Sequence, residues 1–181
     1  MKKIIINFLF LFLSIPFVCG QEQILPIPSN HPSPAQQKQI ARKYGMFIHF
    51  GLNTFQDQEW TDGSKPASSY RPITVDTDQW IRAAKEAGMK YVILTAKHHE
   101  GFCLWDSKYT EYDVASSGNT TNVIESIAKS CKKYDIGLGL YYSLWDRKVN
   151  ADVKDPGKDA AYNEYMLRQL DELIDIVQPH T

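Results

Sequence analysis

Residues 90–105 decide the fold; they read Lys90-Tyr-Val-Ile-Leu-Thr-Ala-Lys-His98-His99-Glu100-Gly-Phe-Cys-Leu-Trp105. The apolar, β-branched first half predicts a buried strand over 90–98. Parallel α/β sheets and barrels build their ligand sites at the carboxyl ends of such strands. We therefore expect the two imidazoles to bind a ligand's hydroxyls, and the rings of Phe102 and Trp105 to face a ring-shaped ligand such as a sugar. The alternative is a pair of surface histidines at the start of a loop.

Strands and helices alternate on both sides of this stretch. The sequence predicts strands over 44–52 and 136–143, a short helix over 37–43, and longer helices over 79–87, 123–134 and 160–177. Asp78 and Asn122 are suited to cap two of the helices, Gly88 to close one, and Pro179 to end the last. This alternation predicts an α/β fold built from βαβ units, with a parallel sheet and right-handed crossovers.

Polar side chains mark the ends of all three predicted strands. His49 lies near the end of the first, His98 and His99 end the second, and Tyr141 lies near the end of the third. Because parallel strands collect their carboxyl ends on one side, we expect these side chains to share one site. A lone strand histidine is more often a core residue, so the case for His49 depends on its place at the strand exit beside Gly51.

The segment 53–77 after the first strand is about twice as long as a βα connection requires, which indicates a functional loop. Within it, Glu59 and Trp60 pair a carboxylate with an indole. The carboxylate could bind neighbouring hydroxyls, and the indole could stack on the apolar face of a ring. Taken alone, the pair is better explained as a solvated acid beside a packing tryptophan.

The histidines and Glu100 also have the chemistry of metal ligands. Adjacent histidines on a strand point to opposite faces, so both reach one ion only if the strand ends between them. Neither an HxH nor an HExxH spacing occurs in the chain. We therefore expect no metal and no cofactor, and we keep a metal-dependent barrel enzyme as a lesser alternative.

Residues 1–20 differ from the rest of the chain. A charged start, an apolar run over 4–13 and small residues near Gly20 predict a secretory signal peptide that is cleaved before Gln21. The apolar run is short of the roughly 20 residues that a membrane span needs. We expect an exported protein, periplasmic or secreted, and a lipoprotein anchor at Cys19 is the weaker alternative because bulky residues precede it.

The length and composition of the whole chain suit one globular domain. The 181 residues are 43% hydrophobic with a formal net charge of −1, and no basic stripe suits a nucleic acid. Residues 21–36 carry four prolines and predict an extended lead-in to a domain over 37–181. Once the signal peptide is removed only Cys103 and Cys131 remain, and we expect two buried thiols rather than a disulfide.

Together these segments resemble the α-L-fucosidases of glycoside hydrolase family 29. The resemblance covers about residues 44–177 and rests on Met46-Phe-Ile-His-Phe-Gly51, Glu59-Trp60, Leu94-Thr-Ala-Lys-His-His-Glu-Gly-Phe-Cys-Leu-Trp105 and Gly139-Leu-Tyr-Tyr-Ser-Leu-Trp-Asp-Arg147. The histidine pair with its flanks is its most specific part. Glu100 departs from the family, which often has aspartate there, but retains the acid. Asn53-Thr-Phe and the ending Ser143 to Arg147 look more like the branch that prefers α-1,3/1,4-linked fucose.

The resemblance implies a (β/α)8 TIM-type barrel and retaining hydrolysis of terminal α-linked L-fucose from fucosylated oligosaccharides or glycoconjugates. By resemblance, the fucose pocket is formed by His49, Glu59, Trp60, His98, His99 and Tyr141. The family uses an aspartate nucleophile and a separate acid/base about 5 Å apart, and both are expected beyond Thr181.

A full barrel has eight strands and about 250 residues, so we expect 37–181 to hold about the first three βα units of a catalytic domain truncated at its C-terminal end. Such a chain would be inactive alone. The alternative from another class is a non-catalytic fucose-binding protein that kept the pocket and lost the acids.

Overall fold

The computed structural model describes residues 31–149 and 156–177. At its centre is a parallel sheet in the order β1-β2-β3, formed by Met46–Ile48, Tyr91–Lys97 and Gly137–Tyr142. This sheet confirms the predicted βαβ arrangement in the described part of the chain. The predicted signal peptide, residues 21–30 of the lead-in and Pro179 lie outside the described residues.

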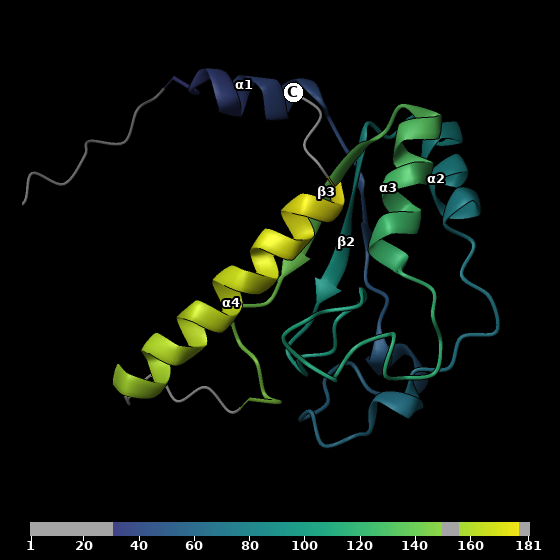
Figure 1. Cartoon of the computed structure of the whole chain (residues 1–181). Coiled ribbons are helices and arrows are strands. Elements are labelled where there is room, and N and C mark those ends of the chain that lie inside the picture. The colour runs from purple at the N-terminus through teal and green to yellow at the C-terminus, as the bar shows by residue number, and fades with distance from the viewer. Residues whose placement is uncertain (1–30, 150–155, 178–181) are drawn as a thin grey trace, which may run out of the picture.

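The helices agree with the sequence pattern to within a few residues. They are α1 (Pro34–Ala41), the short 3-10 helices η1 (Leu52–Phe55) and η2 (Ala67–Ser69), α2 (Thr77–Glu86), α3 (Val123–Tyr134) and α4 (Pro156–Val177). Asn122 caps α3 as predicted, with its side chain accepting from the Glu125 amide at 3.0 Å. Figure 1 shows α2 and α3 side by side at the sheet, and α4 running beside β3.

Two helix starts differ from the prediction. The cap of α2 is Asp76, whose side chain accepts from the Gln79 amide at 2.9 Å, and not Asp78. Asp78 lies in the first turn and binds Lys133 and Ser130 of α3, so it joins two helices instead of starting one. The carboxylate two residues earlier is the one that reaches the free amides.

The helix α1 begins at Pro34, inside the predicted lead-in. Ser33 and Gln36 form a reciprocal capping box, with the Ser33 amide donating to the Gln36 side chain at 2.7 Å. Proline fits the first helical position because the amide it lacks would have no intrahelical partner there. Proline content alone therefore placed the end of the lead-in too late.

The core lies between β2 and the helices α2 and α3, with Val92, Leu94, Ile81 and Ile127 fully buried. Both expected thiols, in the described residues, are free and buried. None of the described helices combines the length and hydrophobicity that a membrane crossing requires.

Phe102 and Trp105 belong to this core as well. Their exposed fractions are 1% and 0%, so the prediction that their rings face a ligand is wrong. The Phe102 ring packs 5.0 Å from that of Tyr70, and the Trp105 indole donates to Glu172 of α4 at 3.0 Å. Their place behind the histidines is structural.

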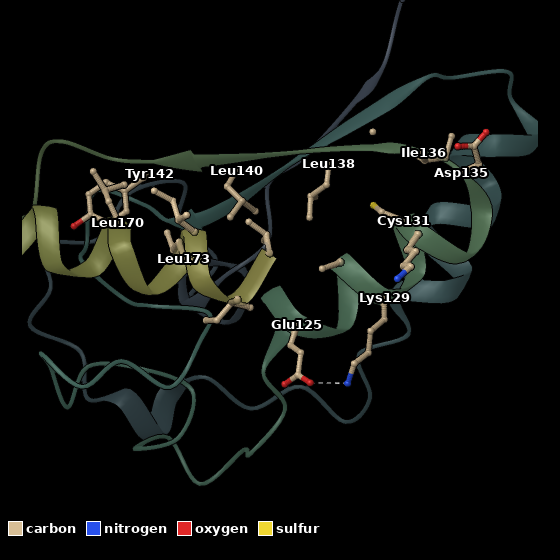
Figure 2. A pocket seen from close by; sticks show the side chains of 16 residues that line it. Glu125, Lys129, Cys131, Asp135, Ile136, Leu138, Leu140, Tyr142, Leu170 and Leu173 are labelled. Carbon is tan, nitrogen blue, oxygen red and sulfur yellow. Dashed lines mark hydrogen bonds and ion pairs between the residues drawn. The ribbon is translucent and has the colours of Figure 1, made fainter. Parts of the chain in front are cut away.

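A cavity of about 860 Å³ lies between α3, β3 and α4. Figure 2 shows Leu138 and Leu140 of β3 pointing into it, opposite Leu170 and Leu173 of α4. Among the described strands, β3 pairs only with β2, which leaves its other edge open. This cavity is lined mainly by apolar side chains and contains none of the histidines, so the candidate site lies elsewhere.

Candidate functional site

The polar ends of the three strands meet at one edge of the sheet. The ring centroids of His49 and His98 are 4.5 Å apart, those of His98 and His99 are 4.2 Å apart, and Tyr141 lies 6.1 Å from His98. The structure therefore brings together the four side chains that the strand pattern predicted to converge.

The end of β2 explains how two adjacent histidines reach the same site. The register with β3 shifts between Thr95 and Lys97, and the strand ends at Lys97. His98 and His99 therefore lie in the turn that follows, where the amide of Gly101 donates to the carbonyl of His98 at 3.0 Å. A regular strand would have sent the two imidazoles to opposite faces.

A cavity of about 300 Å³ opens beside these rings. Its lining comprises His49, Phe50, Gly51, Asn53, Thr54, Gln58, Glu59, His98 and Glu100. Three of the six predicted pocket residues are in this lining, while Trp60, His99 and Tyr141 adjoin it through ring contacts with one another or with His98. Glu59 reaches the cavity with an exposed side chain, as a ligand-binding carboxylate at a rim would.

Glu100 is the buried carboxylate of the site, with an exposed fraction of 1%. The Asn53 side-chain amide donates to it at 2.9 Å and to the carbonyl of Glu59 at 3.0 Å. Nδ1 of His98 lies 3.3 Å from the same carboxylate, although the pair is not aligned as a hydrogen bond. Asn53 thus ties the long loop to the base of the pocket, which gives that loop a fixed position.

His99 has a defined tautomer. Its Nδ1 lies 2.7 Å from the Ser143 hydroxyl, and that hydroxyl lies 2.6 Å from the carbonyl of Trp145. A carbonyl oxygen can only accept a hydrogen bond, so the Ser143 hydroxyl donates its one hydrogen bond to the carbonyl of Trp145. The same hydroxyl must therefore accept a hydrogen bond from Nδ1–H of His99. This leaves Nε2 of His99 as the acceptor nitrogen.

The surroundings of His49 and His99 lower the pKa of both imidazoles, which favours their neutral form near pH 7. Burial is the main cause that lowers the pKa of His99, followed by the adjacent His98. Burial and then His98 also lower the pKa of His49. A neutral imidazole presents one acceptor and one donor, which suits a hydroxyl ligand that can do both.

Two half-exposed tryptophans border the site. The Trp60 ring stands edge-on to His99 at 5.3 Å, and the Trp145 ring lies 5.2 Å from the same imidazole. Their exposed fractions are 49% and 48%. The Arg147 guanidinium lies 4.4 Å from the centre of the Trp145 ring, and its backbone amide donates to the carbonyl of His99 at 2.8 Å.

Sequence reasoning gave no roles to Asn53, Ser143, Trp145 and Arg147, which the structure adds to the site. A signal was present for three of them, because residues 143–147 directly follow β3 as His98 and His99 follow β2. In the described ranges 31–149 and 156–177, no group of three or more histidine, cysteine, aspartate or glutamate side chains could hold a metal ion.

Neutral imidazoles, a buried carboxylate and an exposed indole at the ends of parallel strands form a site for a hydroxyl-rich ring, as in carbohydrate-binding α/β proteins. The family model for alpha-L-fucosidase matches residues 28–181, and the chain belongs to this family.

Individual relatives agree with this membership. "Alpha-L-fucosidase 1" of Arabidopsis thaliana is 44% identical over 154 residues, which are 83% of this chain and 29% of that protein. The crystal structure of a putative alpha-L-fucosidase from Bacteroides ovatus is 41% identical, with a TM-score of 0.73 over 79% of this chain and 24% of that one. A family 29 alpha-L-fucosidase from Bacteroides thetaiotaomicron, trapped as a covalent intermediate with 2-fluoro-fucosyl fluoride, is 30% identical with a TM-score of 0.70.

The chain spans 29% of the Arabidopsis protein and 40% of the trapped Bacteroides enzyme. The catalytic domain of these structural neighbours is a TIM-type barrel. The three-stranded parallel sheet, with its site at the carboxyl ends of the strands, is consistent with part of such a barrel.

Proposed function

We propose that this chain is the N-terminal part of the catalytic domain of an exported α-L-fucosidase, which releases terminal α-linked L-fucose from glycans or glycoconjugates with retention. The observation that carries the proposal is the convergence of His49, His98 and His99 beside Trp60 in a member of the α-L-fucosidase family.

In this proposal the predicted pocket residues hold the fucose. The acceptor Nε2 of His99 accepts a hydrogen bond from a sugar hydroxyl, and His49 and His98 bind neighbouring hydroxyls with Glu59 at the rim. Trp60 lies against the apolar side of the ring that carries the methyl group, and Tyr141, whose ring lies 6.1 Å from that of His98, also contacts the sugar. Each hydrogen bond of this kind contributes about 0.5–1.5 kcal/mol.

We place both catalytic carboxyl groups beyond Thr181, so that this chain alone is inactive. Retention requires a nucleophile and an acid/base that flank the scissile bond about 5 Å apart. Glu100 is a poor candidate for either role, because its carboxylate is buried and accepts a hydrogen bond from Asn53. The covalent intermediate trapped in the Bacteroides thetaiotaomicron relative supports retention, and the fraction of that chain matched here leaves room for the missing acids.

The finer parts of the proposal rest on the sequence. The predicted signal peptide over 1–20 supports export, and the segment from Ser143 to Arg147 supports a preference for α-1,3/1,4 linkages. Hydrolysis of matched α-1,2-, α-1,3-, α-1,4- and α-1,6-fucosides by the full-length protein tests the linkage. Amino-terminal sequencing of the exported protein tests cleavage before Gln21.

The decisive variant is His99→Ala in the full-length enzyme, assayed with an aryl α-L-fucoside. We expect kcat/KM to fall by about ten- to a thousandfold, because a hydrogen bond to the sugar is lost and such bonds tighten in the transition state. Lys129→Ala on the exposed surface of α3 is the matched control and should leave kcat/KM unchanged.

A change in kcat/KM of less than about twofold for His99→Ala would show that His99 does not bind the sugar. Fucose binding without any turnover by the unmodified full-length protein would instead identify the non-catalytic fucose-binding protein.

A further inference from the structure

A buried ion pair lies directly behind the pocket. Nζ of Lys97 is 2.5 Å from Oδ2 of Asp146, and the two side chains are 0% and 1% exposed. The ammonium also donates to the Tyr142 hydroxyl at 2.9 Å and to Oε1 of Gln169 at 3.1 Å. The ammonium therefore has two hydrogen-bond acceptors, on β3 and on α4, and its ion-pair partner on the turn after β3.

The partner carboxylate organises that turn. Oδ1 of Asp146 accepts from the backbone amides of Lys148 at 3.0 Å and Val149 at 3.2 Å. Gly101 approaches so closely that a Cβ there would lie 2.4 Å from Oδ1 of Asp146. Because Gly101 also has a φ of +89°, it is the residue that allows the two turns to touch.

The same two turns carry the pocket. His98 and His99 follow Lys97, while Trp145 and Arg147 flank Asp146. Backbone bonds join the turns on both sides of the ion pair: the Ser143 amide donates to the carbonyl of Lys97 at 2.9 Å, and the Arg147 amide to that of His99 at 2.8 Å. The Lys97–Asp146 ion pair and the Ser143–His99 hydrogen bond thus connect the end of β2 and its turn to the turn after β3.

We propose that Lys97 and Asp146 are positioning residues, which hold the Ser143–Arg147 turn so that Ser143 fixes the tautomer and the direction of His99. Stability alone explains the pair poorly, because burying two charges costs as much as their attraction returns, and an apolar pair of similar size is often as stable. What an apolar pair cannot supply is the carboxylate that binds the amides of Lys148 and Val149. The role in catalysis rests on the proposed fucosidase function, and the role in orienting His99 does not.

The test uses the full-length enzyme and two variants. Asp146→Asn keeps the shape and one acceptor oxygen but removes the charge, and Lys97→Met/Asp146→Leu replaces the pair by apolar side chains. Asp113→Asn is the matched control, because Asp113 is also buried and binds the amides of Ser107 and Ser116 in another turn. The readouts are kcat/KM on an aryl α-L-fucoside, the melting temperature, and the protonation of the His99 ring nitrogens in ¹⁵N-histidine NMR spectra.

We expect both variants to lose about ten- to a hundredfold in kcat/KM, as misplaced binding groups do. The double variant should melt within about 3 °C of the enzyme, a change of less than about 1 kcal/mol. Both should lose the Nδ1–H tautomer of His99, and Asp113→Asn should keep it with activity within about twofold.

A stable double variant with an unchanged His99 tautomer and activity within twofold would overturn the proposal. The NMR result decides the role of the pair even if the unmodified protein shows no turnover, which would count against the proposed function alone.

Discussion

Two pairs of aromatic residues lie close to the histidines, and they differ in burial. Phe102 and Trp105 are 1% and 0% exposed, whereas Trp60 and Trp145 are 49% and 48% exposed and contact His99 with their rings. The first pair is nearer to the histidines in sequence, yet it is the second pair that borders the site. Distance along the chain is therefore a poor guide to which ring meets a ligand.

The direction of the backbone after each strand explains the difference. After Gly101 the chain turns back along β2, with Cys103 opposite Lys97 and the Leu104 amide donating to the carbonyl of Ala96 at 3.0 Å. Rings on this returning segment enter the core. Trp60 and Trp145 lie on segments that leave the sheet, and their rings remain at the rim.

The largest expected effect separates the two pairs by stability. Trp105→Ala should lower the free energy of unfolding by about 3–5 kcal/mol, because it leaves a large cavity and removes the donor to Glu172. Trp60→Ala should change it by about 0.5 kcal/mol or less, as exposed substitutions do. Denaturant unfolding of the full-length variants measures both values. An equal loss of unfolding free energy for Trp60→Ala and Trp105→Ala would contradict the distinction between a rim tryptophan and a core tryptophan.

Ligand affinity should separate the pairs in the opposite sense. Trp60→Ala should weaken L-fucose binding about five- to tenfold, the effect of losing roughly 50 Å² of apolar contact. Phe102→Leu, a buried substitution of similar polarity, serves as the control and should leave the affinity of the folded protein within about twofold. Titration calorimetry with L-fucose measures both. Equal losses would place Phe102 at the ligand after all.

Much of the fold could be predicted from the sequence because local signals and tertiary structure agree. The strand over 90–98, the cap at Asn122 and the convergence of His49 with His98 and His99 all follow from strand periodicity and the direction of parallel strands. The cap of α2 was predicted at the wrong residue. Asp76 caps the helix because its carboxylate reaches a free backbone amide, and the positions of Asp76 and Asp78 in the sequence do not show which of the two does so.

The rest of the site depends on contacts between distant segments. The hydrogen bond from Asn53 to Glu100 and the hydrogen bond between Ser143 and His99 join residues more than forty positions apart in the sequence. Burial of Trp105 depends on Glu172 of α4, which is still further away. No local pattern encodes such pairings, so the sequence predicted where the site lies but not what holds it.

A smaller effect concerns pH and the imidazole on which the exposed rings pack. Because the pKa of His49 and of His99 is lowered in the folded protein, the unfolded chain takes up protons first as the pH falls through about 6.5. Folding is therefore favoured above that pH, and the contribution of these two residues is lost as the pH falls toward their lower folded values. His99→Gln should flatten this part of the stability profile, measured by unfolding between pH 7.5 and 5 at about half-unit steps. A steeper profile for the variant would contradict the lowered pKa.

The central claim is that the side chains at the three strand ends form one fucose site, and the structure of the full-length protein with bound L-fucose tests it most directly. We expect the sugar to lie against His49, His98 and His99, with Trp60 on its apolar side and Nε2 of His99 within about 3 Å of a hydroxyl oxygen. Fucose bound away from these imidazoles, or in the apolar cavity between α3, β3 and α4, would contradict the account.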